Sequence, residues 1–148
     1  MSVVVRQATI EDLEHLAPLF DSFRQFCQKK ADVRLAHAFL AERIQREESL
    51  ILVAELSDRL AGFTQLYPSF SSVDASRTFI LSDLFVAPEA RRKGVAQALL
   101  AKATQVARTQ GAASLSLSTA RANKQAQKLY ESQGWEQDDF FFHYNLAL

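Results

Sequence analysis

The sequence predicts a mixed α/β fold in which helices cover a β-sheet. Two amphipathic helical repeats come first, two strand-like runs joined by a short polar turn follow, and a strand, a loop, a helix and another strand then succeed one another. Apolar residues at helical spacing thus give way to short apolar runs typical of strands, and the two kinds of segment then alternate. Elements in this order are expected to form a mixed sheet with helices packed on its faces.

Two helices are predicted in the first third of the chain, after a short strand at residues 1–6. Thr9 is expected to cap the first helix, because acidic residues follow it and apolar residues then recur every three or four positions. Residues 32–48 repeat the pattern with charges on the opposite side, which predicts a second helix. The apolar positions that define the two helices are Leu13, Leu16, Phe20 and Phe23, then Leu35, Phe39, Leu40 and Ile44.

A β-hairpin is predicted next. Residues 50–54 and 60–67 are apolar runs that flank a polar turn at 57–59. The serine-rich segment 68–76 is expected to end the hairpin. Residues 78–86 then predict a further strand, which is closed by a proline.

The last part of the chain is predicted to alternate helices with strands. Residues 95–111 have the spacing of a helix that ends at a glycine, and the alternating run 114–118 predicts a short strand. Residues 123–133 predict another helix, again stopped by a glycine. The aromatic-rich run 140–146 predicts a final strand.

Length and composition indicate one compact domain over residues 1–148, large enough to bury a core without staples. Lysine plus arginine equals aspartate plus glutamate at 17 each, so no overall field attracts a polyanion and no nucleic-acid partner is expected. The single cysteine, Cys27, gives no disulfide and no cysteine-based zinc cluster, which favours a reducing cytoplasm. Apolar runs are far shorter than the roughly 20 residues that span a bilayer, so no membrane partner is expected. The three histidines lack a ligand spacing, and no metal is expected.

The most informative segment is 84–100, where a strand passes into a basic turn and then into a helix. The first N–H groups of a helix have no partner inside it and carry partial positive charge, so they bind phosphates well. Gly94 allows close approach of the backbone, Ala96 leaves room for a ligand, and three consecutive cations before Gly94 attract a polyphosphate. A solvated basic turn without a ligand is the alternative interpretation. The glycine patterns of nucleotide-hydrolysing P-loops and of dinucleotide-binding folds are both missing.

Two motifs connect this segment to a known family. Arg91-x-x-Gly94-x-Ala96, after a strand ending in Asp-Leu-Phe-Val and before a Leu-Leu pair, resembles the Gln/Arg-x-x-Gly-x-Gly/Ala motif of GNAT acetyltransferases. The run Asn-Lys-Gln-Ala-Gln-Lys-Leu-Tyr-Glu-Ser-Gln-Gly-Trp at 123–135 resembles that family's Asn-x-x-Ala-x-x-Leu-Tyr-x-x-x-Gly-Phe/Trp helix. Taken without the family, Asn123 is an ordinary helix cap and Tyr130 a half-buried helix aromatic. Within the family, the 83–86 stretch and the spacing look most like diamine and similar small-amine acetyltransferases.

The resemblance implies a mixed, mostly antiparallel twisted sheet with helices on both faces, and acetyl-CoA at the splay between the central strands. It also implies acetyl-CoA as co-substrate and a homodimer. The residues that it places around acetyl-CoA are Leu84, Phe85 and Val86 along the pantetheine arm, Arg91, Arg92, Lys93, Gly94, Val95, Ala96 and Gln97 around the pyrophosphate, and Asn123, Gln125, Ala126 and Tyr130 on the later helix.

Acetyl transfer from a thioester to an amine needs a neutral amine, a donor for the oxyanion and a proton for the leaving thiolate. Tyr130, a phenol with a pKa of about 10, is expected to protonate the CoA sulfur, and a backbone N–H at 84–86 to polarise the acetyl carbonyl. Diamine acetyltransferases carry an acid where this chain has Ser82. Asp83 is therefore expected to act through water or to attract a cationic substrate, and a carboxylate merely paired with a neighbour is the alternative. Because successive strand residues face opposite sides, Asp83 is not expected to take the place of Ser82.

The predicted function is N-acetylation, by direct attack, of a primary amine on a small molecule such as a polyamine, an amino acid or a xenobiotic amine. Ser82, Asp83 and the aromatic residues Tyr67, Phe70 and Phe142 are the candidate acceptor-site residues. Two alternatives stay open. One is acetylation of a protein lysine or N-terminal amine, and the other is a non-catalytic module that binds acyl-CoA and regulates a partner.

Overall fold

The computed structural model describes residues 2–148, so Met1, which belongs to the predicted first strand, lies outside the described residues. Contacts divide the chain into two compact units, Met1–Ser118 and Thr119–Leu148, and each unit is described by itself. The single domain expected from the length stays a prediction.

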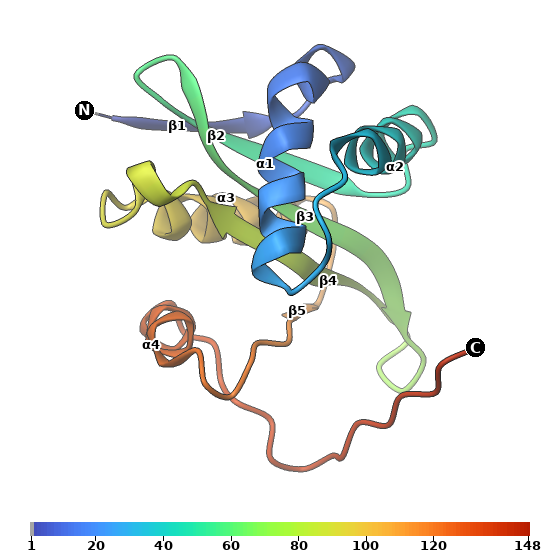
Figure 1. The fold of residues 1–148 in the computed structure, drawn as a ribbon. Coiled ribbons are helices and arrows are strands. Elements are labelled where there is room, and N and C mark those ends of the chain that lie inside the picture. Colours follow the sequence, from blue (N-terminus) through green and yellow to red (C-terminus); the bar gives the residue numbers. More distant parts are fainter. Residues whose placement is uncertain (1) are drawn as a thin grey trace. The chain divides into compact units, whose positions relative to one another are not determined.

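The first unit is built on a five-stranded sheet in the order β1-β2-β3-β4-β5 (Figure 1). Neighbours among the first four strands are antiparallel, whereas β5 runs parallel to β4. The mixed, mostly antiparallel sheet expected from the sequence is therefore confirmed. The strands are β1 (Val3–Gln7), β2 (Leu50–Leu56), β3 (Arg59–Ser71), β4 (Ser76–Val86) and β5 (Ser114–Ser116).

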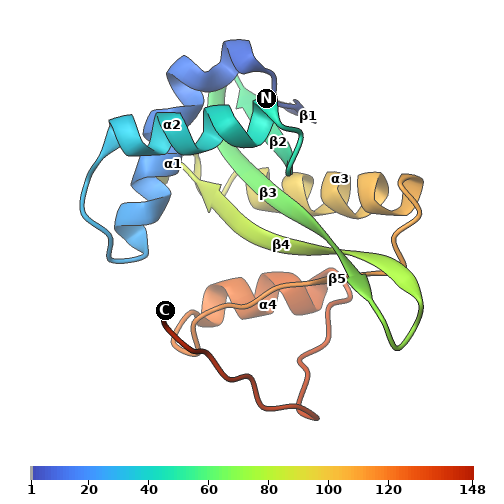
Figure 2. The ribbon, with the colours of Figure 1, turned by 90° about the vertical axis from the view of Figure 1, so that its right-hand side faces the viewer.

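Helices cover both faces of this sheet (Figure 2). One face carries α1 (Leu13–Phe26), which follows the short 3-10 turn η1 (Ile10–Asp12), and α2 (Val33–Gln45). The opposite face carries α3 (Val95–Thr109). Neighbouring residues of β3 show the division, because Phe63 packs on Phe20 of α1 while Gly62 lies against the start of α3. The two helices predicted early in the chain and the helix predicted after the basic turn are confirmed.

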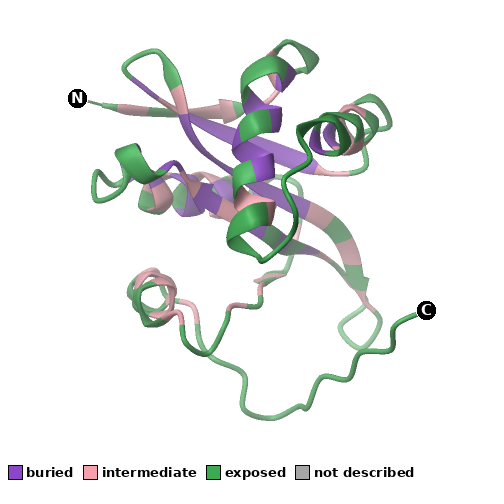
Figure 3. Ribbon diagram, in the orientation of Figure 1, coloured by how far each residue is buried: buried purple, intermediate pink, exposed green. Residues whose placement is uncertain are grey.

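The core of the first unit lies between the sheet and these helices, as the buried segments of Figure 3 show. On the α1 face, the ring of Phe20 stacks on Phe39 at 5.8 Å between centroids and meets Phe63 edge-on at 5.9 Å. On the α3 face, a Cβ added to Gly62 would stand 2.8 Å from the Phe85 carbonyl oxygen and 3.2 Å from Val95 Cγ1. Glycine at position 62 therefore allows the start of α3 to pack closely against β3, beside the end of β4.

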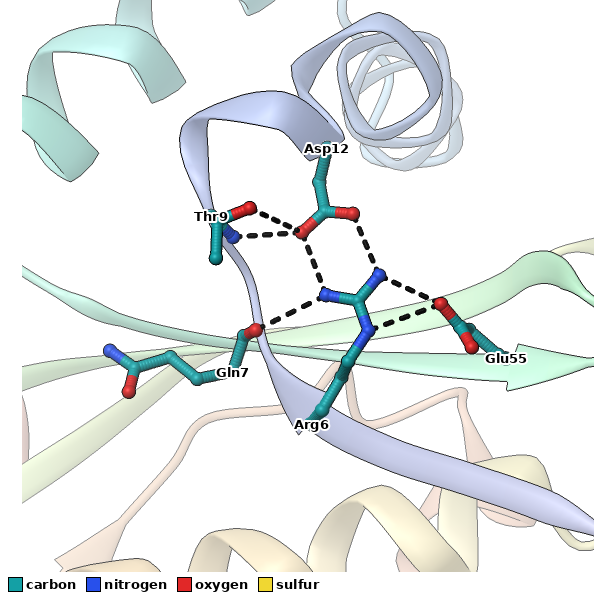
Figure 4. A network of polar contacts seen from close by, with 5 residues as sticks. All are labelled: Arg6, Gln7, Thr9, Asp12 and Glu55. Carbon is teal, nitrogen blue, oxygen red and sulfur yellow. Dashed lines mark hydrogen bonds and ion pairs between the residues drawn. The ribbon is translucent and has the colours of Figure 1, made fainter.

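An ion-pair network fixes the start of the chain to the sheet (Figure 4). The Arg6 guanidinium on β1 donates to both carboxylate oxygens of Asp12 in η1, at 2.9 and 2.8 Å, and to Glu55 on β2 at 2.7 Å. The Asp12 carboxylate also accepts from the Thr9 backbone N–H, as expected of a helix start. Arg6 holds the pKa of Asp12 below its usual value. This network therefore positions η1, and with it α1, over the sheet.

The predicted hairpin is confirmed, but it is longer than expected. Ser57 and Asp58 form its two-residue turn, and both have positive φ (53° and 62°), as a type I′ turn requires. The prediction that 68–76 ends the hairpin is wrong, since β3 continues through Pro68 to Ser71 and β4 already begins at Ser76. Beyond Leu66, β4 is the only strand that pairs with β3 among the described residues. Proline is tolerated at this position because β3 has a hydrogen-bonded neighbour on one side only, so the missing N–H of Pro68 need not leave an unpaired group inside the sheet.

One residue of the predicted helical core is placed wrongly. Asp32 caps α2 by accepting the Leu35 N–H at 3.1 Å, which confirms the start of this helix. Leu35, however, is 51% exposed, and Ala36 and Leu40 are the buried residues of α2. Only a narrow stripe of α2 is buried, because this helix packs mainly on α1 and through one side. Leu35, in the first turn of α2, therefore faces outward.

The second unit contains one helix, α4 (Lys124–Ser132), as predicted. Asn123 caps it by accepting the Ala126 N–H at 3.2 Å, and Gly134, with φ of +92°, follows its end. The prediction of a strand at 140–146 is wrong, because residues 133–148 form neither helix nor strand in the structure. The unit offers this apolar run no strand with which to pair among its described residues, so propensity alone does not produce a ladder.

Every helix among residues 2–148 is too short or too polar to cross a membrane.

Candidate functional site

The end of β4 presents an open strand edge. The parallel ladder between β4 and β5 covers Thr78 to Ile80. In the described part of the chain, no strand pairs with Leu81–Val86 on the side away from β3. Backbone N–H and C=O groups on such an edge are ready to bind an extended molecule that carries amides. The predicted pantetheine strand, Leu84, Phe85 and Val86, lies at this edge.

A β-bulge at Ser82 sets the direction of the side chains near this edge. Gln65 of β3 pairs with Asp83, and the next residue, Leu66, pairs with Leu81, so Ser82 is the extra residue of β4. The bulge turns Leu81 and Asp83 to opposite faces, although they are two residues apart. The neighbouring Ser82 side chain lowers the pKa of the Asp83 carboxyl. Ser82 is exposed whereas Asp83 is buried, and the expectation that Asp83 does not take the place of Ser82 stays a prediction.

The loop after β4 leads into an uncapped helix N-terminus. Arg92 (φ 64°) and Gly94 (φ 80°) both adopt left-handed backbone conformations, and α3 begins at Val95. The first backbone bond of the helix runs from the Ala98 N–H to the Gly94 carbonyl, and no side chain among the described residues caps the preceding N–H groups. The N–H groups of Val95, Ala96 and Gln97 thus have no helical acceptor and can bind an anion.

The cations of this loop differ in their contacts. Arg91 donates to the Val86 carbonyl at 3.0 Å and lies 5.5 Å from the Phe85 ring centroid, so its side chain braces the end of β4. Arg92, Lys93 and Gly94 are exposed, whereas Val95 is buried and anchors the helix. The loop therefore offers two exposed cations beside the free N–H groups, which is a suitable environment for a diphosphate.

A buried polar cluster lies on the α1 face of the sheet, next to the β4 edge. Asp83 is 5% exposed and Gln65 is fully buried. Gln65 donates from Nε2 to Asp83 Oδ2 at 2.6 Å and accepts at Oε1 from the Ser49 hydroxyl at 2.7 Å. Thr64, on the other face, donates to the Asp83 carbonyl at 2.7 Å. Burial raises the pKa of Asp83, and the hydrogen bonds from Gln65 and Ser82 lower it in part.

Aromatic rings lie two residues further along β4, and two further titratable groups interact with the Asp83 charge. Phe85 meets Phe23 at 6.0 Å and Phe26 at 6.2 Å between centroids, and both partners come from the end of α1. Burial, with a contribution from the Asp83 charge, raises the pKa of Tyr67 to about 12. Partial burial of the thiol and the charge of Asp83 also raise the pKa of Cys27, although the residue as a whole is exposed. A carboxylate near aromatic rings provides both charge and cation–π attraction for an alkylammonium.

The remaining candidate residues are divided between the two units. Tyr67 joins the Asp83 cluster, but Phe70 lies on the opposite face of β3, is 72% exposed and contacts Arg77. In the second unit, Phe142 is 90% exposed, while Tyr130 is half-buried against Trp135 at 6.1 Å between ring centroids. Burial raises the pKa of Tyr130. Asn123, Gln125 and Ala126 occupy the first turn of α4 and its cap.

Sequence reasoning missed Gln65, Ser49 and Thr64. Gln65 and Thr64 are polar residues inside the otherwise apolar run of β3, and both are fully buried. A polar residue at an inward position of a buried strand was the signal available, because such residues are buried only with a hydrogen-bonding partner.

The geometry defines a class of protein. An open strand edge leads into a basic loop and a free helix N-terminus, with a buried carboxylate on the adjoining face, and this combination suits an enzyme that transfers an acyl group from CoA to an amine. The chain belongs to the acetyltransferase (GNAT) family, whose model matches residues 13–135. It is an N-acetyltransferase, and GNAT acetyltransferases use acetyl-CoA.

Individual relatives agree with this assignment. The chain is 46% identical over 142 residues to the uncharacterized N-acetyltransferase YhfO of Bacillus subtilis, covering 96% of this chain and 95% of that protein. A crystal structure of a probable acetyltransferase has a TM-score of 0.91 and 45% identity, covering 100% of this chain and 98% of that chain. The aminoglycoside N-acetyltransferase AAC(6')-Iy, in complex with CoA, shares the fold with a TM-score of 0.83 at 21% identity, over 99% of this chain and 96% of that chain.

Proposed function

We propose that this enzyme moves the acetyl group of acetyl-CoA to the primary amine of a small molecule, such as a polyamine, an amino acid or a xenobiotic amine. The observation that carries the proposal is the buried Asp83 carboxylate on β4, two residues before the aromatic cluster at Phe85 and beside the open edge of the strand. A buried negative charge that is compensated only by neutral donors attracts a compact cation.

In this proposal, acetyl-CoA binds along β4 and the following loop. The pantetheine arm extends along the edge at Leu84, Phe85 and Val86, whose backbone groups replace a missing strand. The pyrophosphate sits on the N–H groups of Val95 to Gln97, near Arg92 and Lys93. A backbone N–H of the β4 edge donates to the acetyl oxygen and stabilises the oxyanion.

Two side chains handle the protons. An alkylammonium with a pKa near 10 must lose a proton before it attacks the thioester. Asp83 takes this proton through water, because its low exposure leaves little room for direct contact, and its raised pKa makes it a stronger base than an ordinary carboxylate. The amine nitrogen then attacks the acetyl carbon, the carbon–sulfur bond breaks, and Tyr130 protonates the thiolate. The raised pKa of Tyr130 keeps the phenol protonated until that step. The nitrogen loses its second proton to water as the amide forms, and a proton from water restores the Tyr130 phenol.

A protein lysine or N-terminal amine is the second candidate acceptor. Asp83 is only 5% exposed, and we favour a small amine because a peptide acceptor would need more of this side chain to be accessible. The two candidates can be distinguished by offering a basic peptide and free amines as acceptors, because only a protein acetyltransferase is expected to acetylate the peptide.

The test is a thiol-release assay with acetyl-CoA against polyamines, amino acids, aryl and alkyl amines and a basic peptide. We expect turnover on one class of small amine. Tyr130→Phe is expected to lower kcat by about 100-fold, within the range of general acid catalysis, while acetyl-CoA still binds. Trp135→Phe, which keeps an aromatic ring beside Tyr130, is the control. Turnover on the peptide alone would replace the small-amine proposal by the protein acceptor, and an unchanged kcat in Tyr130→Phe would remove that residue from the mechanism.

A further inference from the structure

Gln65 and Ser49 form a hydrogen-bonded chain behind Asp83. The Ser49 hydroxyl, in the loop before β2, donates to Gln65 Oε1 at 2.7 Å, and Gln65 Nε2 donates to Asp83 Oδ2 at 2.6 Å. Both polar atoms of the Gln65 side chain are thus engaged, and the residue is fully buried. A side-chain amide satisfied in this way holds one orientation, because turning it over would place its oxygen against the carboxylate.

The orientation of the amide favours one charge state of Asp83. The Gln65 N–H can donate to either form of the Asp83 carboxyl, but its hydrogen bond to the ionised form is charge-assisted and therefore stronger. Ser49 holds the Gln65 oxygen on the far side of the amide, so the chain Ser49–Gln65–Asp83 keeps a donor on the carboxylate and stabilises it against the cost of burial. The neighbouring Ser82 side chain also lowers the pKa of this carboxyl.

We infer that Gln65 and Ser49 are positioning residues for acetyl transfer, which keep the Asp83 carboxylate ionised and oriented toward the acceptor amine. The inference rests on the proposed role of Asp83. Neither residue touches a substrate in this account, since both act through the carboxylate. Loss of either is therefore expected to change amine recognition and its pH dependence without changing the binding of acetyl-CoA.

The other charged and titratable groups around this site are known from the structure. Cys27 at the end of α1 and Tyr67 on β3 both interact with the Asp83 charge. Arg43 of α2 and Glu48 of the following loop interact with Tyr67. Arg43 also pairs with Glu42 and Glu48. Cys27 and Tyr67 have raised pKa values and stay neutral through the acidic range, so the acid side of the pH profile is assigned to Asp83.

The sign of the expected shift follows from the contacts. Gln65→Met removes the donor and keeps the volume, so the carboxylate becomes harder to ionise and its pKa rises. The acid limb of kcat/KM for the amine is then expected to move to higher pH by about one unit, with a tenfold or larger rise in the KM for the amine at neutral pH. Ser49→Ala frees the amide to turn over and is expected to cause a smaller shift in the same direction. Ser49→Thr keeps the hydroxyl and is expected to restore the wild-type profile.

The test combines kinetics with a measurement that needs no turnover. The pH profile and both KM values are measured for the wild type, Gln65→Met, Ser49→Ala and Ser49→Thr, with Asp83→Asn as reference. The carboxyl ¹³C shift of Asp83 is titrated by NMR without substrate in the same proteins, and thermal unfolding verifies that each is folded.

The outcomes separate the inference from the proposed function. A raised Asp83 midpoint in Gln65→Met and Ser49→Ala, reversed in Ser49→Thr and matched by the acid limb, supports the inference. If Asp83→Asn impairs amine turnover but both midpoints equal that of the wild type, the positioning role is wrong and the proposed function survives. If Asp83→Asn leaves the amine KM and the acid limb unchanged, the proposed function of Asp83 fails instead. If Gln65→Met does not fold, the variants Ser49→Ala and Ser49→Thr decide the question. The shift of the Asp83 midpoint expected in the first and the wild-type midpoint expected in the second do not require a change at position 65.

Discussion

Replacing Gly94 by aspartate is expected to weaken acetyl-CoA binding by about 100-fold, which corresponds to about 2.7 kcal/mol. Gly94 has a φ of 80° directly before α3, and a Cβ at this position would meet no other atom within 4 Å. The new carboxylate would therefore fit without a clash, next to the free N–H groups of Val95 to Gln97. There it would compete for those donors and repel a diphosphate.

The neutral variant Gly94→Asn provides the matched control. Asparagine has nearly the same size as aspartate, and both tolerate the left-handed conformation better than other side chains. We expect the asparagine variant to bind acetyl-CoA only a few-fold more weakly than the wild type in titration calorimetry. If the two variants bind acetyl-CoA equally well, the negative charge is irrelevant and the phosphate site does not lie at this helix.

Replacing Asp83 by asparagine is expected to lower kcat/KM for the amine by about 100-fold or more, the usual contribution of a general base. The amide keeps the shape of the carboxylate but can neither take a proton nor attract an ammonium group. In the wild type, activity should fall as the pH drops through the raised pKa of Asp83, because protonation removes the base. The asparagine variant is expected to lose this acid limb and to keep its affinity for acetyl-CoA.

A second buried aspartate offers a control for effects of folding. Asp21 on α1 is 7% exposed and accepts hydrogen bonds from the Asp32 backbone and from Gln25. Asp21→Asn should lower thermal stability to a degree comparable with Asp83→Asn, yet leave kcat/KM for the amine close to that of the wild type. Equal losses of activity in both variants would show that Asp83 acts through stability and not through chemistry.

Most of the fold could be predicted because local signals agreed with the packing. Thr9 precedes the 3-10 turn that leads into α1, Asp32 and Asn123 cap α2 and α4, and the polar pair Ser57-Asp58 forms the turn of the hairpin. The failures have physical causes. Pro68 was expected to break a strand, but it lies where β3 has one neighbour, and the aromatic run 140–146 has strand propensity without a strand partner in its own unit.

The candidate site could be predicted only in part. The basic loop and the start of α3 are local features of sequence, so the glycine and the helical spacing were sufficient to predict them, and their role in binding phosphate stays a proposal. The Asp83 cluster depends on a bulge that one-dimensional alternation cannot show, and on Gln65 and Ser49, which are 18 and 34 positions away in the chain. Register shifts and side-chain pairs across strands are set by tertiary packing, and a single sequence does not report them.

The crystal structure of the complex with acetyl-CoA tests the central claim most directly. The account predicts that the pyrophosphate accepts hydrogen bonds from the N–H groups of Val95, Ala96 and Gln97. It predicts pantetheine amides paired with the β4 edge at Leu84 to Val86, and the Tyr130 hydroxyl within hydrogen-bond reach of the sulfur. The account would be contradicted if acetyl-CoA bound away from the β4 edge and the start of α3. It would also be contradicted if the sulfur lay out of reach of Tyr130 and the thioester lay on the face of the sheet opposite Asp83.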